Sequence, residues 1–124
     1  MNGGAEWLGM EVLKTEFWVS ALIRRAEIGG AFAGIVRKGD VDGGAVLVKV
    51  ATLDGRARLY APAQNGEGER IWLDLSSGPL GDTEPEVDAY ARKRAASDPD
   101  LWVVEIEDKS GRNFLTEPID PRKA

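Results

Sequence analysis

Acidic side chains gather in one short stretch of the sequence, and their spacing could serve metal chemistry. Asp98 and Asp100 come just before an alternating segment in which Glu105 and Glu107 occupy every second position. Such spacing places side chains on one face of a β-strand, and carboxylate oxygens are preferred ligands of Mg²⁺ and Ca²⁺. These four residues are a candidate metal site. The favoured alternative is an exposed strand face whose acids pair with basic residues of neighbouring strands, either Lys49 or the strand of Arg56 and Arg58.

A second candidate is a group of basic residues in the first third of the chain. Arg24, Arg25, Arg37 and Lys38 would form an anion or phosphate-backbone site if the fold brings them together, because guanidinium groups bind phosphate with two parallel hydrogen bonds. The more ordinary interpretation is that they pair with the surplus of Asp and Glu or stay in solvent. The net charge of −5 favours this second interpretation.

Two loop motifs carry less information. Residues 40–44 begin like a calcium-binding loop, but Ala51 stands where the bidentate Glu is needed. Residues 29–34 are rich in glycine but match neither common phosphate-loop spacing. Both segments are better interpreted as turns.

The composition excludes several classes of chemistry. The 124 residues contain no cysteine and no histidine. This removes disulfides, thiolate nucleophiles, Ser-His-Asp machinery and nearly every transition-metal site. Oxygen-ligand metal binding, carboxylate or lysine acid–base work and plain binding remain. We therefore expect no cofactor and name no catalytic residue.

The charge and hydropathy of the chain limit its partners. A net charge of −5 and a pI near 4.8 make nucleic acid a possible but disfavoured partner. The apolar runs are shorter than the roughly 20 residues that span a bilayer, so we expect no membrane partner and a cytoplasmic location.

The elements that must position these side chains follow from periodicity and turn chemistry. The run from Leu101 to Glu107 alternates as a strand, with Trp102, Val104 and Ile106 on one face. Asp54-Gly55 joins two further strands in a hairpin. The predicted strands in this part of the chain are 45–53, 56–60, 70–75 and 101–107, with 113–115 completing a terminal hairpin.

The helical segments are less uniform. Thr83 and Glu86 have the spacing of a capping box, with Pro85 in the first turn, so a helix is predicted to begin there. Residues 14–25 alternate with two apolar faces and are predicted as a strand, with a helix as the alternative. Residues 31–38 are predicted as a short helix, although Gly34 weakens it.

These elements predict an α+β domain. We expect a mostly antiparallel sheet of about five strands, with a short and a longer helix packed on one face. Residues 13–115 would form the single domain, between a flexible leader at 1–12 and a flexible tail at 116–124.

Three blocks in the same order as in a known family carry a resemblance. They are KTEFWVSA at 14–21, RKGD at 37–40 leading into GAVLVKV at 44–50, and DPDLWVVEIED at 98–108. With these blocks the chain resembles the small bacterial family catalogued as domain of unknown function 1491. The resemblance implies no reaction, cofactor or site residue.

We therefore expect a small non-catalytic module that binds a protein partner or a second copy of itself through a sheet face or edge. An anion or nucleic-acid binder using the basic group is the first alternative. A divalent-metal-dependent hydrolase using the strand carboxylates is the second.

Overall fold

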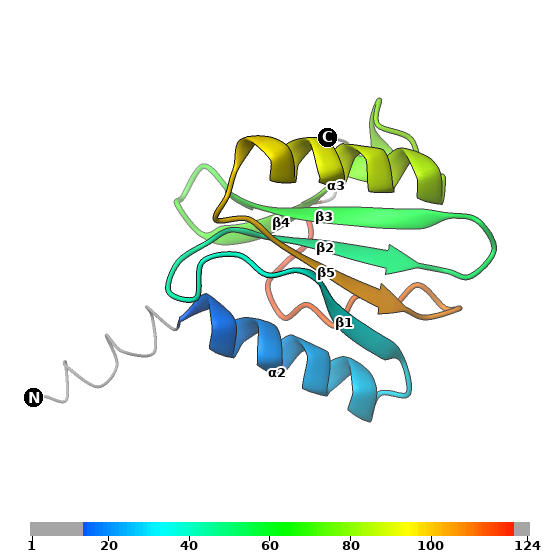
Figure 1. The fold of residues 1–124 in the computed structure, drawn as a ribbon, viewed down its shortest axis with the longest axis horizontal. Helices are drawn as coiled ribbons and strands as arrows, with labels where there is room; N and C mark the ends of the chain where they lie inside the picture. Colours follow the sequence, from blue (N-terminus) through cyan, green and yellow to red (C-terminus); the bar gives the residue numbers. More distant parts are fainter. Residues whose placement is uncertain (1–13, 121–124) are drawn as a thin grey trace, which may run out of the picture.

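The computed structural model describes residues 14–120, which fold into a five-stranded sheet between two helices (Figure 1). The elements follow in this order: α2 (Thr15–Ile28), β1 (Phe32–Arg37), β2 (Val46–Ala51), β3 (Ala57–Gln64), β4 (Arg70–Asp74), the 3₁₀ turn η1 (Leu75–Ser77), α3 (Glu84–Ser97) and β5 (Trp102–Glu107). The predicted α+β class and the five-stranded sheet are confirmed.

The strand order across the sheet is β1-β5-β2-β3-β4. All neighbours run antiparallel except β2 and β5, which are parallel and pair from Val46 with Trp102 to Ala51 with Glu107. A parallel pair needs a long crossover, and the segment from β3 through α3 provides it. The last strand in sequence is therefore inserted next to the middle of the sheet.

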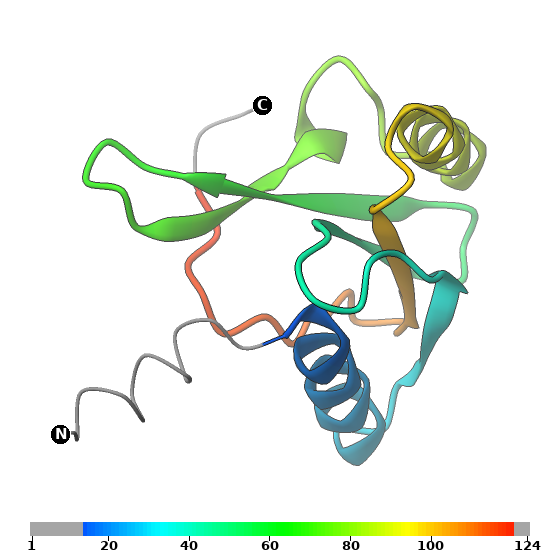
Figure 2. The ribbon, with the colours of Figure 1, turned by 60° about the vertical axis from the view of Figure 1, so that its left-hand side comes forward.

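The helices cover opposite faces of the sheet, whereas the sequence analysis expected both on one face (Figures 1 and 2). Val19 and Leu22 of α2 pack in one apolar cluster with Val48 and Val104, while Val87 of α3 packs in a second cluster on the other face. All six residues of β2 are buried. A strand that is apolar on both faces needs a cover on each, which explains the two-sided arrangement.

The first two predicted elements were wrong, because their types are exchanged. Residues 15–28 form a helix rather than a strand, with Val19, Leu22 and Ala26 buried at helical spacing. Residues 32–37 form strand β1 rather than a helix. Here the β-branched pair Ile35 and Val36 and the helix-weakening Gly34 favour the extended backbone.

Helix α3 begins at the predicted capping box. The Thr83 side chain accepts a hydrogen bond from the Glu86 amide, and the Glu86 carboxylate accepts one from the Thr83 amide. The helix ends at Ser97, with Asp98 as its C-cap before Pro99. These local signals need no distant partner, and the helix lies where they indicate.

The C-terminal segment runs beside β4. The Trp72 amide donates to the Pro118 carbonyl at 2.9 Å, and the Asp120 amide donates to the Trp72 carbonyl at 2.8 Å. Pro118 and Asp120, in the expected flexible tail, are thus bonded to the sheet, and residues 113–115 do not form the expected strand. The expected leader at 1–12 and residues 121–124 lie outside the described part of the chain.

Candidate functional site

Strand β1 forms an edge of the sheet, and its outer side is apolar and exposed. No charged residue occurs from Phe32 to Val36. The exposed fractions are 74% for Phe32, 48% for Ile35 and 62% for Val36. Within residues 14–120 no strand pairs with the outer side of β1, so backbone donors and acceptors are available there.

The opposite edge of the sheet, at β4, is covered by the C-terminal segment. On β4, the tail segment 117–120 covers the outer side through the hydrogen bonds of Trp72. Proteins ordinarily protect an edge by covering it, charging it or breaking it with proline. One edge of this sheet therefore has a cover, whereas the apolar edge at β1 has none among the described residues.

An open groove of about 330 Å³ lies along β1 and reaches the neighbouring strand β5. Gly34 pairs directly with Glu105, and Phe32 pairs with Glu107, so these four residues share the sheet face on the side of α3. Nothing lies within 4 Å of the position where a Cβ of Gly34 would stand. The groove thus has an apolar rim, an open notch at Gly34 and two carboxylates in its floor.

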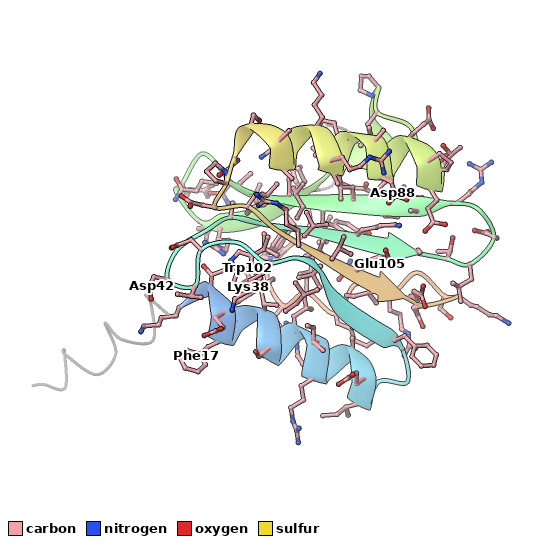
Figure 3. The ribbon with its side chains drawn as sticks, viewed as in Figure 1. Phe17, Lys38, Asp42, Asp88, Trp102 and Glu105 are labelled. Carbon is pink, nitrogen blue, oxygen red and sulfur yellow. The ribbon has the colours of Figure 1, made fainter. Side chains whose placement is uncertain are left out.

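One of these carboxylates belongs to an ion cluster under α3. The buried Nζ of Lys49 lies 2.7 Å from the Glu84 carboxylate, 2.7 Å from that of Asp88 and 3.0 Å from that of Glu105. Figure 3 labels Asp88 on α3 and Glu105 on β5. Three acids surround one base, so acidic groups outnumber basic groups in the cluster.

Burial by itself would lower the pKa of Lys49, but hydrogen bonds to Asp88, Glu84 and Glu105 outweigh it and hold the pKa above its ordinary value. Lys49 is therefore a permanent cation at neutral pH. It cannot act as a neutral amine, so the cluster suits structural pairing rather than general base catalysis.

The four predicted metal residues do not converge. Asp98 and Asp100 lie in the turn before β5, where the Asp98 carboxylate accepts a hydrogen bond from the Asp100 amide at 3.0 Å. Glu105 is five residues beyond Asp100, or about 16 Å along an extended chain, and is paired with Lys49. Among residues 14–120 no group of three acids is arranged to hold a metal ion.

The four predicted basic residues are also dispersed. Arg37 donates to the backbone carbonyls of Asp98, Pro99 and Leu101, and Lys38 lies 3.7 Å from the Glu16 carboxylate.

Arg24 and Arg25 lie near the other end of α2, and only Arg25 turns inward, donating from Nε to the Phe114 carbonyl at 3.1 Å. Nine residues of helix, or about 13 Å, separate Glu16 from Arg25. The structure therefore does not bring the four residues into one basic surface.

Sequence reasoning missed the edge groove because residues 31–38 were predicted as a helix. The available signal was the uncharged run from Phe32 to Val36, which contains two β-branched residues. Sequence reasoning named Lys49 or the strand of Arg56 and Arg58 as partners of the strand acids; the pairing of Lys49 with Glu105 is present, whereas Arg56 and Arg58 pair with Asp82 and Asp74. It missed Glu84 and Asp88, whose four-residue spacing on a helix places them on one face.

No helix within residues 14–120 is long and apolar enough to cross a membrane.

Comparison with known proteins gives a family but no activity. The family described as "Protein of unknown function (DUF1491)" matches residues 13–116. No curated protein matches this chain. Three similar solved structures come from Caulobacter crescentus CB15 and A. tumefaciens.

The crystal structure of a DUF1491 family protein from Caulobacter crescentus CB15 is 57% identical, with a TM-score of 0.79, covering 87% of this chain and 99% of that one. An NMR structure of a DUF1491 family protein from the same organism is 56% identical, with a TM-score of 0.76 and coverage of 88% and 97%. The solution structure of protein Atu0922 from A. tumefaciens is 36% identical, with a TM-score of 0.71 and coverage of 91% and 99%. The chain therefore belongs to the DUF1491 family.

Proposed function

We propose that this protein is a protein-interaction module that binds an extended segment of a partner along β1. The observation that carries the proposal is the exposed, uncharged edge from Phe32 to Val36. An added strand would use the outward backbone groups of β1 for affinity and the side-chain groove for specificity.

The groove indicates the chemistry of the partner segment. Glu107 has no ion-pair partner among the described residues, and Glu105 shares Lys49 with two other acids. An apolar rim beside two carboxylates fits a segment of alternating apolar residues with one Lys or Arg. The aliphatic stem of that Lys or Arg would lie over Gly34, and its charged group would reach Glu105 and Glu107.

A second copy of this chain fits the groove less well. In a pair of β1 strands, the one basic residue of the strand, Arg37, already donates to the carbonyls of Asp98, Pro99 and Leu101 and is not free to pair with Glu105 and Glu107. Heterologous binding is therefore favoured over self-association. We include in the proposal the cytoplasmic location that the sequence analysis expected, which cell fractionation would test.

The other two candidate functions receive less support. A nucleic-acid surface would require the dispersed basic residues to act together. A metal-dependent hydrolase would require an open carboxylate group, whereas the three acids that do converge already surround the ammonium of Lys49.

A random decapeptide display library tests the proposal. Binders are expected to share alternating apolar residues with one Lys or Arg, and a selected peptide should shift the amide resonances of residues 32–37. The Gly34→Val substitution fills the notch, and Glu107→Lys reverses the charge; each should weaken binding about tenfold or more, an amount equal to about 1.4 kcal/mol.

The matched control is Phe17→Ser, which removes an exposed apolar side chain that points away from the sheet on α2 (Figure 3). This variant should bind as the wild type does. A library that yields no binder, binders without a basic residue, or binding that survives both groove substitutions would contradict the proposal. Concentration-dependent dimers that G34V abolishes would show that a second copy takes the edge instead.

A further inference from the structure

A second cavity, of about 730 Å³, lies on the face of the sheet that α2 covers. Its walls come from α2, from the loop before β2, from the β3–β4 pair and from the tail. Six lining residues supply its chemistry: Thr15, Trp18, Arg25, Arg70, Trp72 and Glu117. Its volume falls in the range of small-molecule sites, roughly 300–1,000 Å³.

Two stacked indoles form the apolar part of the lining. The ring centroids of Trp18 and Trp72 lie 5.5 Å apart, with an angle of 25° between the planes. The Trp72 Nε1 donates to the Glu117 carboxylate at 2.9 Å. Trp72 is buried, whereas Trp18 remains partly exposed, so a flat surface is available next to a fixed ring.

The polar part of the lining contains two arginines that have no ion-pair partner among residues 14–120. Arg25 donates from Nε to Phe114, but its Nη2 atom is buried and has no hydrogen-bond partner within the described chain. Arg70 is exposed and its side chain has no ion pair among residues 14–120. A buried charged donor without a partner is costly, so the Arg25 side chain would gain a hydrogen bond by turning toward an acceptor bound in the cavity.

The acids of the lining are already engaged. Asp42 lies 3.5 Å from the Lys14 ammonium, and Glu117 accepts from Trp72. Neither guanidinium has an ion-pair partner among residues 14–120, and guanidinium binds carboxylate and phosphate with two parallel bonds.

We infer that this cavity binds a small organic anion with a flat apolar body, whose carboxylate or phosphate pairs with Arg25 and Arg70 while its ring lies against Trp18. This site is separate from the β1 groove, since it lies on the opposite face of the sheet. Binding in this cavity does not depend on the proposed binding of a partner segment along β1.

Titration of the full chain with three probes tests the inference. 1-Naphthoate and 1-naphthyl phosphate are flat anions, and 1-naphthalenemethanol has the same body without charge. Calorimetry should show that at least one anion binds with a Kd below about 1 mM and at least about tenfold more tightly than the alcohol. The indole N–H resonances of Trp18 and Trp72 should shift on binding. The anion that binds more tightly identifies whether the site prefers a carboxylate or a phosphate group.

Arg25→Gln and Arg70→Gln should each weaken binding of that anion about tenfold. Because Arg25 also holds the Phe114 carbonyl, the exposed Arg70 gives a variant whose folding should not change. Arg24→Gln is the matched control, since Arg24 is exposed on the same helix and does not line the cavity. Absence of binding by both anions, equal binding of the alcohol, or an equal loss in R24Q would overturn the inference.

Discussion

The Nζ of Lys49, in the middle of the sheet, lies 2.7 Å from a carboxylate oxygen of Asp88 on α3. This contact ties the helix to the strand that is buried on both faces. Glu84 and Glu105 complete the cluster, so one buried cation pairs with two acids from α3 and one from β5. The cluster joins the covering helix to the floor of the proposed docking groove.

Removal of this cation should destabilise the fold. Lys49→Met leaves three partly buried acids facing one another, and we expect the free energy of unfolding to fall by about 2 kcal/mol. This is less than the loss for a fully buried pair, because the acids keep some solvent. Urea denaturation at pH 7 measures the change. Lys93→Met, at an exposed position of α3, is the control; a K49M protein as stable as K93M would contradict the prediction.

The same cluster predicts how stability changes at high pH. The folded-state pKa of Lys49 is raised, so its contribution is fully present below the unfolded-state pKa of about 10.4. The contribution is then lost as pH rises through the folded-state value, because only the folded state still holds the proton. Wild-type stability should therefore decrease above about pH 10 more steeply than that of K49M. Parallel curves for the two proteins in that range would refute this account.

The pair of Asp108 and Arg112 predicts that stability decreases as the pH falls at low pH, the opposite direction to the effect of Lys49. The side-chain and backbone hydrogen bonds from Arg112 lower the pKa of Asp108 to about 2. A lowered carboxylate pKa contributes stability above the unfolded-state value of about 3.9, and this contribution is lost as pH falls through the folded-state value. Asp108→Asn should thus be less stable than wild type at pH 7. The difference should shrink between about pH 4 and pH 2, which acid titration of the unfolding midpoint would show.

Arg37 is predicted to stabilise the turn between α3 and β5. It donates to the carbonyls of Asp98, Pro99 and Leu101, which follow the last residue of α3. Arg37→Ala should cost about 1.5–3 kcal/mol, the usual worth of hydrogen bonds to a charged group. Thermal unfolding against Arg92→Ala, an exposed position of α3, provides the comparison. A loss no larger than that of R92A would show that these bonds contribute little.

Gly29 should not tolerate a larger residue. A Cβ added there would lie 2.5 Å from one ring atom of Phe114 and 2.9 Å from another. Gly29→Ala should therefore destabilise the protein by about 1–3 kcal/mol through overpacking. At Gly43 nothing lies within 4 Å of the added atom, so Gly43→Ala should have a far smaller effect in the same denaturation experiment.

Local chemistry predicted some elements well. The capping box at Thr83 and Glu86 and the alternation from Trp102 to Ile106 depend on residues close in sequence, and the structure has both elements where these signals indicate. The apolar side chains of residues 14–25 fit the period of a strand as well as that of a helix. The sequence analysis predicts a strand there, whereas residues 15–28 form a helix. Short-range periodicity alone does not separate these cases.

The sequence by itself determined the α+β class, the absence of cysteine and histidine chemistry, and the strand on which Glu105 and Glu107 lie. Only the tertiary structure decided that β5 is inserted beside β2, that the helices take opposite faces, and that Phe32 to Val36 form an uncovered edge. The physical reason is that strand neighbours and burial depend on contacts between residues far apart in the chain. The same contacts place Arg25 and Trp72 around one cavity and the acids of α3 around Lys49, where no local pattern could have placed them.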